Sequence, residues 1–143
     1  ADLPVLCVCR GMQALNVISG GSLIQDLGEK HPGHGHSLND RGEETTSRHR
    51  IFIAPGSRLA SSVGSGGLVR VNSWHHQGVA EANKSPKLMA SAYAVEDGLI
   101  EALESPHHRW VVGVQFHPEL RGEMPPHFDR LFDGLVERAR DWK

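Results

Sequence analysis

The sequence predicts an α/β fold in which helices flank a mainly parallel sheet. An apolar run over residues 4–8 is followed at once by residues at helical spacing, which is typical of a strand-turn-helix unit. A second apolar run, 110–116, is typical of a buried strand. After Pro125 and Pro126, apolar residues recur at helical spacing up to Ala139, which indicates an amphipathic helix packed on the sheet. Strands mixed with helices in this way favour the α/β class.

Turn residues and local spacing define the elements in between. Gly20-Gly21 ends the helix that begins after Cys9, and Gly64 ends a helical turn over 57–63. Asp97-Gly98 predicts a tight turn between two strands. A stretch rich in Gly, His and acidic residues, 29–47, is expected to be a long exposed loop. The expected strands are 4–8, 50–54, 68–71, 88–95, 99–103 and 110–116.

The composition indicates one soluble domain and argues against two classes of partner. With 143 residues and 38% hydrophobic content the chain can bury a core, so we expect a single domain over residues 1–143. Its 15 basic and 17 acidic residues give a net charge of −2, which offers nucleic acid no broad cationic surface. The apolar runs are too short to cross a membrane.

Two cysteines near the start of the chain are expected to be free thiols. Cys7 and Cys9 are separated by one residue, a spacing unsuited to a structural disulfide. The beginning of the chain does not show the basic-then-apolar pattern of a secretion leader. We therefore expect a cytoplasmic protein.

Cys9 is the candidate nucleophile. It lies where the first strand meets a helix N-terminus, whose dipole and unpaired N–H groups favour a thiolate, although a strand-end cysteine is more often a small buried apolar residue. A cysteine nucleophile also needs a base and a group that orients the base. His117 and Glu119 directly follow the strand 110–116, at the edge where open α/β sheets bind ligands. Taken alone they would be a surface turn, but paired with Cys9 they predict a Cys-His-Glu triad.

Four segments carry a family resemblance. They are Pro4-Val5-Leu6-Cys7-Val8-Cys9-Arg10-Gly11-Met12-Gln13-Ala14-Leu15-Asn16-Val17 with Gly20-Gly21-Ser22-Leu23; Val71-Asn72-Ser73-Trp74-His75-His76-Gln77; Gly98-Leu99-Ile100-Glu101-Ala102; and Gly113-Val114-Gln115-Phe116-His117-Pro118-Glu119. In this order along the chain they resemble the motifs of the class I glutamine amidotransferase-like family. The resemblance is greatest to its γ-glutamyl-γ-aminobutyrate hydrolase branch.

The resemblance implies a flavodoxin-like fold and a hydrolase of γ-glutamyl amides that needs no cofactor and no metal. Cys9 would attack the γ-amide of a small glutamine-like substrate to give a thioester, His117 would transfer protons, and Glu119 would orient His117. The backbone N–H of Arg10 would stabilise the oxyanion. The expected substrate-binding residues are Arg10, Gln13, Asn72, Ser73 and His75. The alternative for 72–77 is a core or lid tryptophan with solvated histidines.

Two departures from the family pattern bear on what the resemblance implies. Cys7 stands where family members usually have glycine, which adds bulk beside the strand-to-helix turn. In the family the nucleophile comes near the middle of the domain, whereas here it is residue 9. We therefore expect a partial domain without the N-terminal half and its second oxyanion donor. The strand 4–8 would then expose unpaired backbone, so a homo-oligomer or an N-terminal partner chain is expected.

Other interpretations remain open at this point. A silent assembly module that has kept the motifs, and the glutaminase component of an ammonia-channelling synthetase, are the alternatives to a hydrolase. His31, His34 and His36 have a spacing that zinc could use, but the surrounding glycines favour a loop without metal. Gly64-Ser65-Gly66-Gly67 has neither the lysine nor the helix of a phosphate-binding loop, so a turn is expected there.

Overall fold

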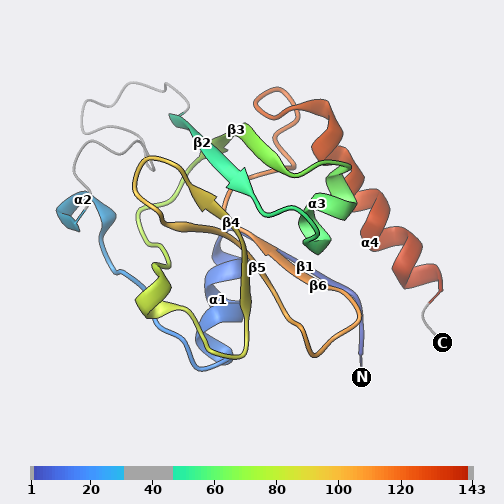
Figure 1. The fold of residues 1–143 in the computed structure, drawn as a ribbon, viewed down its shortest axis with the longest axis horizontal. Helices are drawn as coiled ribbons and strands as arrows, with labels where there is room; N and C mark the ends of the chain where they lie inside the picture. Colours follow the sequence, from blue (N-terminus) through green and yellow to red (C-terminus); the bar gives the residue numbers. More distant parts are fainter. Residues whose placement is uncertain (1, 31–46, 142–143) are drawn as a thin grey trace.

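The computed structural model describes residues 2–30 and 47–141. Within them a six-stranded sheet runs in the order β1-β6-β5-β4-β2-β3, with helices on both faces (Figure 1). The strands are β1 (Val5–Val8), β2 (Ser47–Ile53), β3 (Gly67–Ser73), β4 (Met89–Ala94), β5 (Ile100–Glu104) and β6 (Val111–Val114). The helices are α1 (Arg10–Ile18), α2 (Leu27–Lys30), α3 (Arg58–Val63) and α4 (Arg130–Arg140), with short 3-10 turns at η1 (Glu81–Asn83) and η2 (Pro126–Asp129).

The α/β class with flanking helices is confirmed, but the sheet is mixed rather than mainly parallel over the described residues. Only β1 and β6 pair in parallel, and the other four neighbouring pairs are antiparallel. The connections explain the difference. Parallel neighbours need a crossover of a dozen or more residues, whereas the chain passes from β4 to β5 and from β5 to β6 through short turns.

The Asp97-Gly98 turn and the end of α3 at Gly64 are observed where the sequence predicted them, and the structure adds a cap at Ser57. Gly98 has a φ of 73° in the β4–β5 turn, and the Asp97 carboxylate accepts a hydrogen bond from the Leu99 N–H at 3.1 Å. Ser57 caps α3 by accepting from a backbone N–H at 3.0 Å, and Gly64 ends α3 with a φ of 92°. Each of these positions needs a specific backbone conformation or a short polar side chain, so the residue type indicates the structure.

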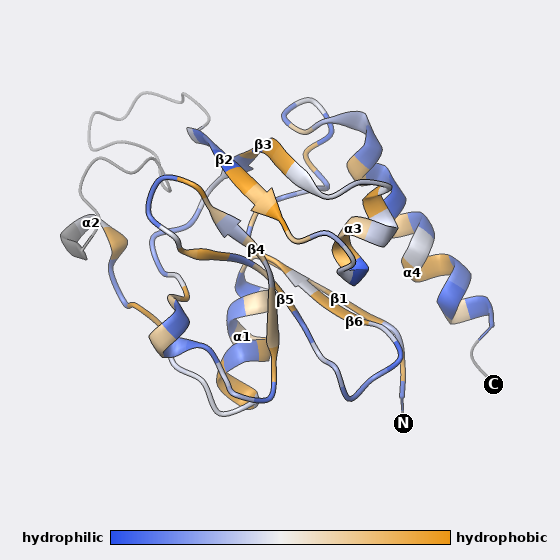
Figure 2. Ribbon diagram, viewed as in Figure 1, coloured by the Kyte–Doolittle hydropathy of each residue, from blue (hydrophilic) through white to orange (hydrophobic). Residues whose placement is uncertain are grey.

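The core lies on both faces of the sheet. On one face, strand residues pack against α3 and α4; the fully buried side chains there include Trp110, Phe116, Phe128, Leu59 and Leu131. On the other face, Met12 of α1 packs against Ile100 and Leu103. Figure 2 shows apolar strand segments between α1 and α4, with polar residues on the outer turns.

The first strand lies at the edge of the sheet. β1 pairs with β6 on one side, and no described strand pairs with its other side. The apolar run predicts a fully buried strand, yet Val5 is 38% exposed and the rest of β1 is half-buried. On the neighbouring helix, Val17 and Ile18 are 47% and 82% exposed. An apolar surface therefore adjoins an unpaired strand edge.

Some predictions fall on residues outside the described part of the chain. The histidines at 31, 34 and 36 and most of the loop over 29–47 lie there. Within the described residues, no group of His, Cys, Asp and Glu is arranged to hold a metal ion. None of the described helices is long and apolar enough to cross a membrane.

Candidate active site

Cys9 occupies the sharp turn between β1 and α1. Its φ of 49° makes it the only described non-glycine residue with positive φ, and its N–H donates to the Val114 carbonyl at 2.7 Å. A non-glycine residue in such a conformation is costly and persists only where its surroundings hold it. Here the parallel pairing of β1 with β6 holds the backbone, so the sulfur is fixed at the N-terminus of α1.

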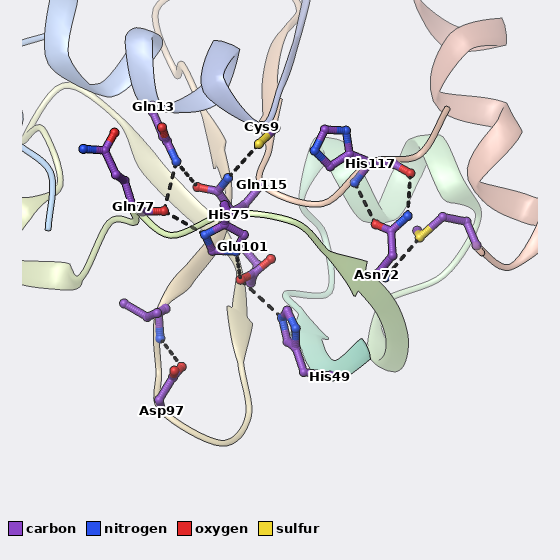
Figure 3. A network of polar contacts seen from close by, with 12 residues as sticks. Cys9, Gln13, His49, Asn72, His75, Gln77, Asp97, Glu101, Gln115 and His117 are labelled. Carbon is purple, nitrogen blue, oxygen red and sulfur yellow. Dashed lines mark hydrogen bonds and ion pairs between the residues drawn. The ribbon is translucent and has the colours of Figure 1, made fainter. Parts of the chain in front are cut away.

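His117 and Glu119 follow the carboxyl end of β6, and Cys9 follows the carboxyl end of the parallel strand β1. Val8 pairs with Val114 in the parallel register, so the next residues along the two strands, Cys9 and Gln115, lie side by side. In Figure 3 the Cys9 sulfur points toward Gln115, which precedes His117 by two residues. His117 Nδ1 lies 2.6 Å from Glu119 Oε1. Since a carboxylate only accepts, Nδ1 carries the proton and Nε2 is left as the basic nitrogen.

The turn does not by itself favour the thiolate, contrary to the prediction from the helix dipole. Burial raises the pKa of Cys9, and this outweighs the hydrogen bonds from the Arg10 backbone and the Gln115 side chain, which lower it. The charge of Glu119 raises it further. The sulfur is therefore a neutral thiol at rest, and it needs a base to become a nucleophile.

A chain of buried amides reaches the sulfur from the other side. Gln115 Nε2 donates to Cys9 Sγ at 3.5 Å, and Gln115 Oε1 accepts from Gln13 Nε2 at 3.2 Å. Gln13 Nε2 also donates to the Gln77 carbonyl at 3.0 Å. Because that carbonyl can only accept, it sets the orientation of both amides and directs an N–H of Gln115 at the sulfur (Figure 3).

A pocket of about 300 Å³ opens beside Cys9. The other residues that line it are Arg10, Gln13, Trp74, His75, His76 and Gln77. Three of the predicted substrate-binding residues, Arg10, Gln13 and His75, therefore contribute to its wall. Among the described residues, the lining does not include Asn72 or Ser73, which are both buried.

A buried carboxylate supports the pocket from behind. Glu101 is fully buried in β5, and its Oε1 lies 3.2 Å from His49 Nε2 and 3.7 Å from His75 Nε2. Burial alone would raise its pKa, but hydrogen bonds and charge from the two histidines lower it to about 2. Burial would lower the pKa of His49, yet Glu101 raises it. The single acid in the apolar run 99–103 was the sequence signal for this group, but its pairing with His49 and His75 was not predicted.

The fold and the site define a class I glutamine amidotransferase-like domain. The chain belongs to the Peptidase C26 family, whose model matches residues 1–119. The family-level resemblance predicted from the sequence motifs is thereby confirmed.

Curated relatives match nearly all of this chain. Protein NtpR of Enterococcus hirae is 38% identical over 141 residues, which make up 94% of this chain and 54% of NtpR. The γ-glutamyl-γ-aminobutyrate hydrolase PuuD of Escherichia coli is 31% identical over 137 residues, 94% of this chain and 53% of that enzyme. The chain spans about half the length of the curated relatives it matches.

Solved structures show the same fold. The glutaminase domain of the Trypanosoma brucei enzyme CTPS, solved with bound acivicin, superposes with a TM-score of 0.63 at 20% identity. The match covers 96% of this chain and 61% of that one. A glutamine amidotransferase from Methylobacillus flagellatus superposes with a TM-score of 0.58 at 18% identity, covering 94% and 44%.

Proposed function

We propose that the protein hydrolyses γ-glutamyl amides through a triad of Cys9, His117 and Glu119. The observation that carries the proposal is the placement of Cys9 and His117 at the ends of two parallel, adjacent strands. The 2.6 Å contact of His117 with Glu119 supports the assignment of base and orienting residue. Membership of the Peptidase C26 family and the likeness to PuuD support the reaction class.

The proposed reaction proceeds in two halves. His117 Nε2 removes the proton of the Cys9 thiol, and the thiolate attacks the γ-carbonyl carbon of the substrate. The oxyanion that forms is stabilised by the Arg10 N–H, which already contacts the sulfur. The C–N bond then breaks, His117 returns the proton to the departing amine, and a γ-glutamyl thioester remains. Water, deprotonated by His117, attacks the thioester, releasing glutamate and restoring the thiol.

The raised pKa of Cys9 gives His117 a definite task. A buried thiol with no base would stay protonated near neutral pH and react slowly. The imidazole has to take that proton at the moment of attack, and Glu119 stabilises the resulting imidazolium at its Nδ1. Removing either partner should therefore affect the chemical step more than substrate binding.

Labelling with a glutamine-like chloroketone near pH 7 tests the assignment of the nucleophile. We expect the label on Cys9 and not on Cys7, a similarly half-buried thiol whose pKa is also raised by burial. The label should be lost in His117→Ala, and γ-glutamyl anilides should release aniline. Equal slow labelling of both cysteines, with no aniline release, would favour the alternative of a silent assembly module.

We also propose that the free edge of β1 and the exposed apolar residues of α1 form an interface. Val5, Val17 and Ile18 expose 38%, 47% and 82% of their surface there. An unpaired edge beside apolar side chains favours addition of a strand, either from a second copy or from an N-terminal partner segment. Light scattering on this chain should show an assembly that Ile18→Lys weakens. A stable, well-folded monomer would rule out addition of a second copy at this edge.

A further inference from the structure

We propose that Asn72 is a positioning residue for His117 and does not bind substrate. This inference rests on the proposed function, because it assigns Asn72 a task in placing the general base. It also replaces the substrate-binding role that the sequence motif implied for this residue.

The Asn72 carboxamide binds the backbone of His117 at two points. Asn72 Oδ1 accepts from the His117 N–H at 2.8 Å, and Asn72 Nδ2 donates to the His117 carbonyl at 3.0 Å. The side chain that makes these bonds is fully buried. Both backbone polar groups of His117 are thus fixed to β3, although His117 itself follows β6 (Figure 3). These two hydrogen bonds hold the His117 backbone and so set the direction in which the imidazole leaves it.

The orientation of the amide is determined by its partners. A backbone N–H can only donate and a backbone carbonyl can only accept, so the oxygen and nitrogen of Asn72 cannot be exchanged. The second hydrogen of Nδ2 is taken by Glu123 Oε2 at 3.1 Å. Both amide hydrogens and the amide oxygen are therefore engaged within the protein, and the amide has no donor left for a substrate.

Glu123 extends the arrangement to the pocket wall. Besides Asn72, its Oε2 accepts from Trp74 Nε1 at 3.0 Å, and Trp74 lines the pocket next to Cys9. One carboxylate thus anchors both the residue that holds the base and the residue that faces the substrate. The general base and the pocket wall are kept in register by this shared acceptor.

Asn72→Asp in the full-length protein tests the proposal with little change in shape. The carboxylate still accepts from the His117 N–H, but it has no donor for the His117 carbonyl and it repels Glu123. We expect kcat with a γ-glutamyl anilide to fall about 10- to 100-fold while KM changes less than about 2-fold, as when a reacting group is misplaced by a fraction of an ångström.

Asn16→Asp is the matched control. Asn16 is also a fully buried asparagine, and its amide binds the carbonyls of Ser22 and Asn83 and accepts from the Ser85 N–H. Its partners lie outside the site, so the variant should lose stability with kcat unchanged. Glu123→Gln serves as a second, half-buried variant in case Asn72→Asp does not fold. It should lower kcat about 3- to 10-fold, because a neutral acceptor holds Asn72 less firmly. Only kcat is diagnostic in this variant, since Glu123 also holds Trp74 of the pocket wall.

The outcomes separate the two proposals. A wild-type protein that neither turns over nor takes the label on Cys9 overturns the proposed function. An active wild type with kcat unchanged in folded Asn72→Asp or in Glu123→Gln overturns the positioning role alone. A rise in KM at constant kcat in Asn72→Asp would return Asn72 to substrate binding and would equally overturn the positioning role.

Discussion

Replacing Glu101 by glutamine should destabilise the protein strongly without changing its shape. The carboxylate is fully buried between His49 and His75, at 3.2 Å and 3.7 Å from their Nε2 atoms. Glutamine has nearly the same volume but no charge, so both imidazoles lose the group that compensates their burial. Removing one partner of a buried pair typically costs about 3 to 5 kcal/mol.

The perturbed pKa values of the same groups give a magnitude and a pH window. The fall in the pKa of Glu101 from 4.5 to about 2 corresponds to about 3 kcal/mol of stability. Because this pKa is lowered, the contribution is present above pH 4.5 and is lost as the pH falls towards 2. The pKa of His49 is raised, so its contribution is full below 6.5 and is lost as the pH rises through its folded value. Stabilisation by the pair is therefore greatest between these two limits.

Urea unfolding of the wild type and of Glu101→Gln across this pH range provides the assay. We expect the difference in unfolding free energy to be about 3 kcal/mol near pH 5.5 and to shrink on both sides. Glu96→Gln is the matched control, because Glu96 pairs with Arg50 at 3.0 Å on the surface, where the side chains are 38% and 55% exposed. It should cost less than about 1 kcal/mol. Equal stability of Glu101→Gln and wild type at pH 5.5 would refute the reasoning.

Three further substitutions give distinct outcomes. Gly113→Ala should lower the free energy of unfolding in urea by about 1 to 3 kcal/mol, because an added Cβ would meet Met12 Cγ at 2.8 Å in a closely packed face. An unchanged free energy of unfolding would mean that α1 shifts freely. Ser57→Ala should cost about 1 kcal/mol by removing the α3 cap, which thermal unfolding measures. His117→Asn should lower kcat roughly 10²- to 10⁴-fold with the melting temperature nearly unchanged; a small loss would identify another base for Cys9.

The features predicted correctly from the sequence are turns and helix ends that a few neighbouring residues determine. The strand-to-helix turn at Cys9, the Asp97-Gly98 hairpin and the end of α3 at Gly64 each depend on a few adjacent residues. The residues of the proposed triad could be named because motifs place them at strand ends. Whether β1 and β6 actually lie side by side is a property of the sheet order, and only the structure gives it.

What the sequence could not predict depends on contacts between distant segments. Asn72 and His117 are 45 residues apart in the chain, and a motif that contains Asn72 does not say whether its amide faces a substrate or a backbone. Glu101 reads as one acid in an apolar strand until the fold brings His49 and His75 to it. The direction of strand pairing was also missed, because local apolar runs look alike in parallel and antiparallel sheets.

The position of Cys9 at the end of an edge strand would link the proposed assembly to the proposed reactivity of Cys9. The Cys9 backbone is held by two hydrogen bonds: its N–H donates to the Val114 carbonyl beside β6, and its carbonyl accepts from the Gln13 N–H of α1. A strand that pairs with the open side of β1 would hold the same turn from the opposite direction and would restrict the movement of the Cys9 sulfur. If the proposed interface forms, it and the fixation of the proposed nucleophile rise together, so the proposed activity should fall on dilution before the protein unfolds.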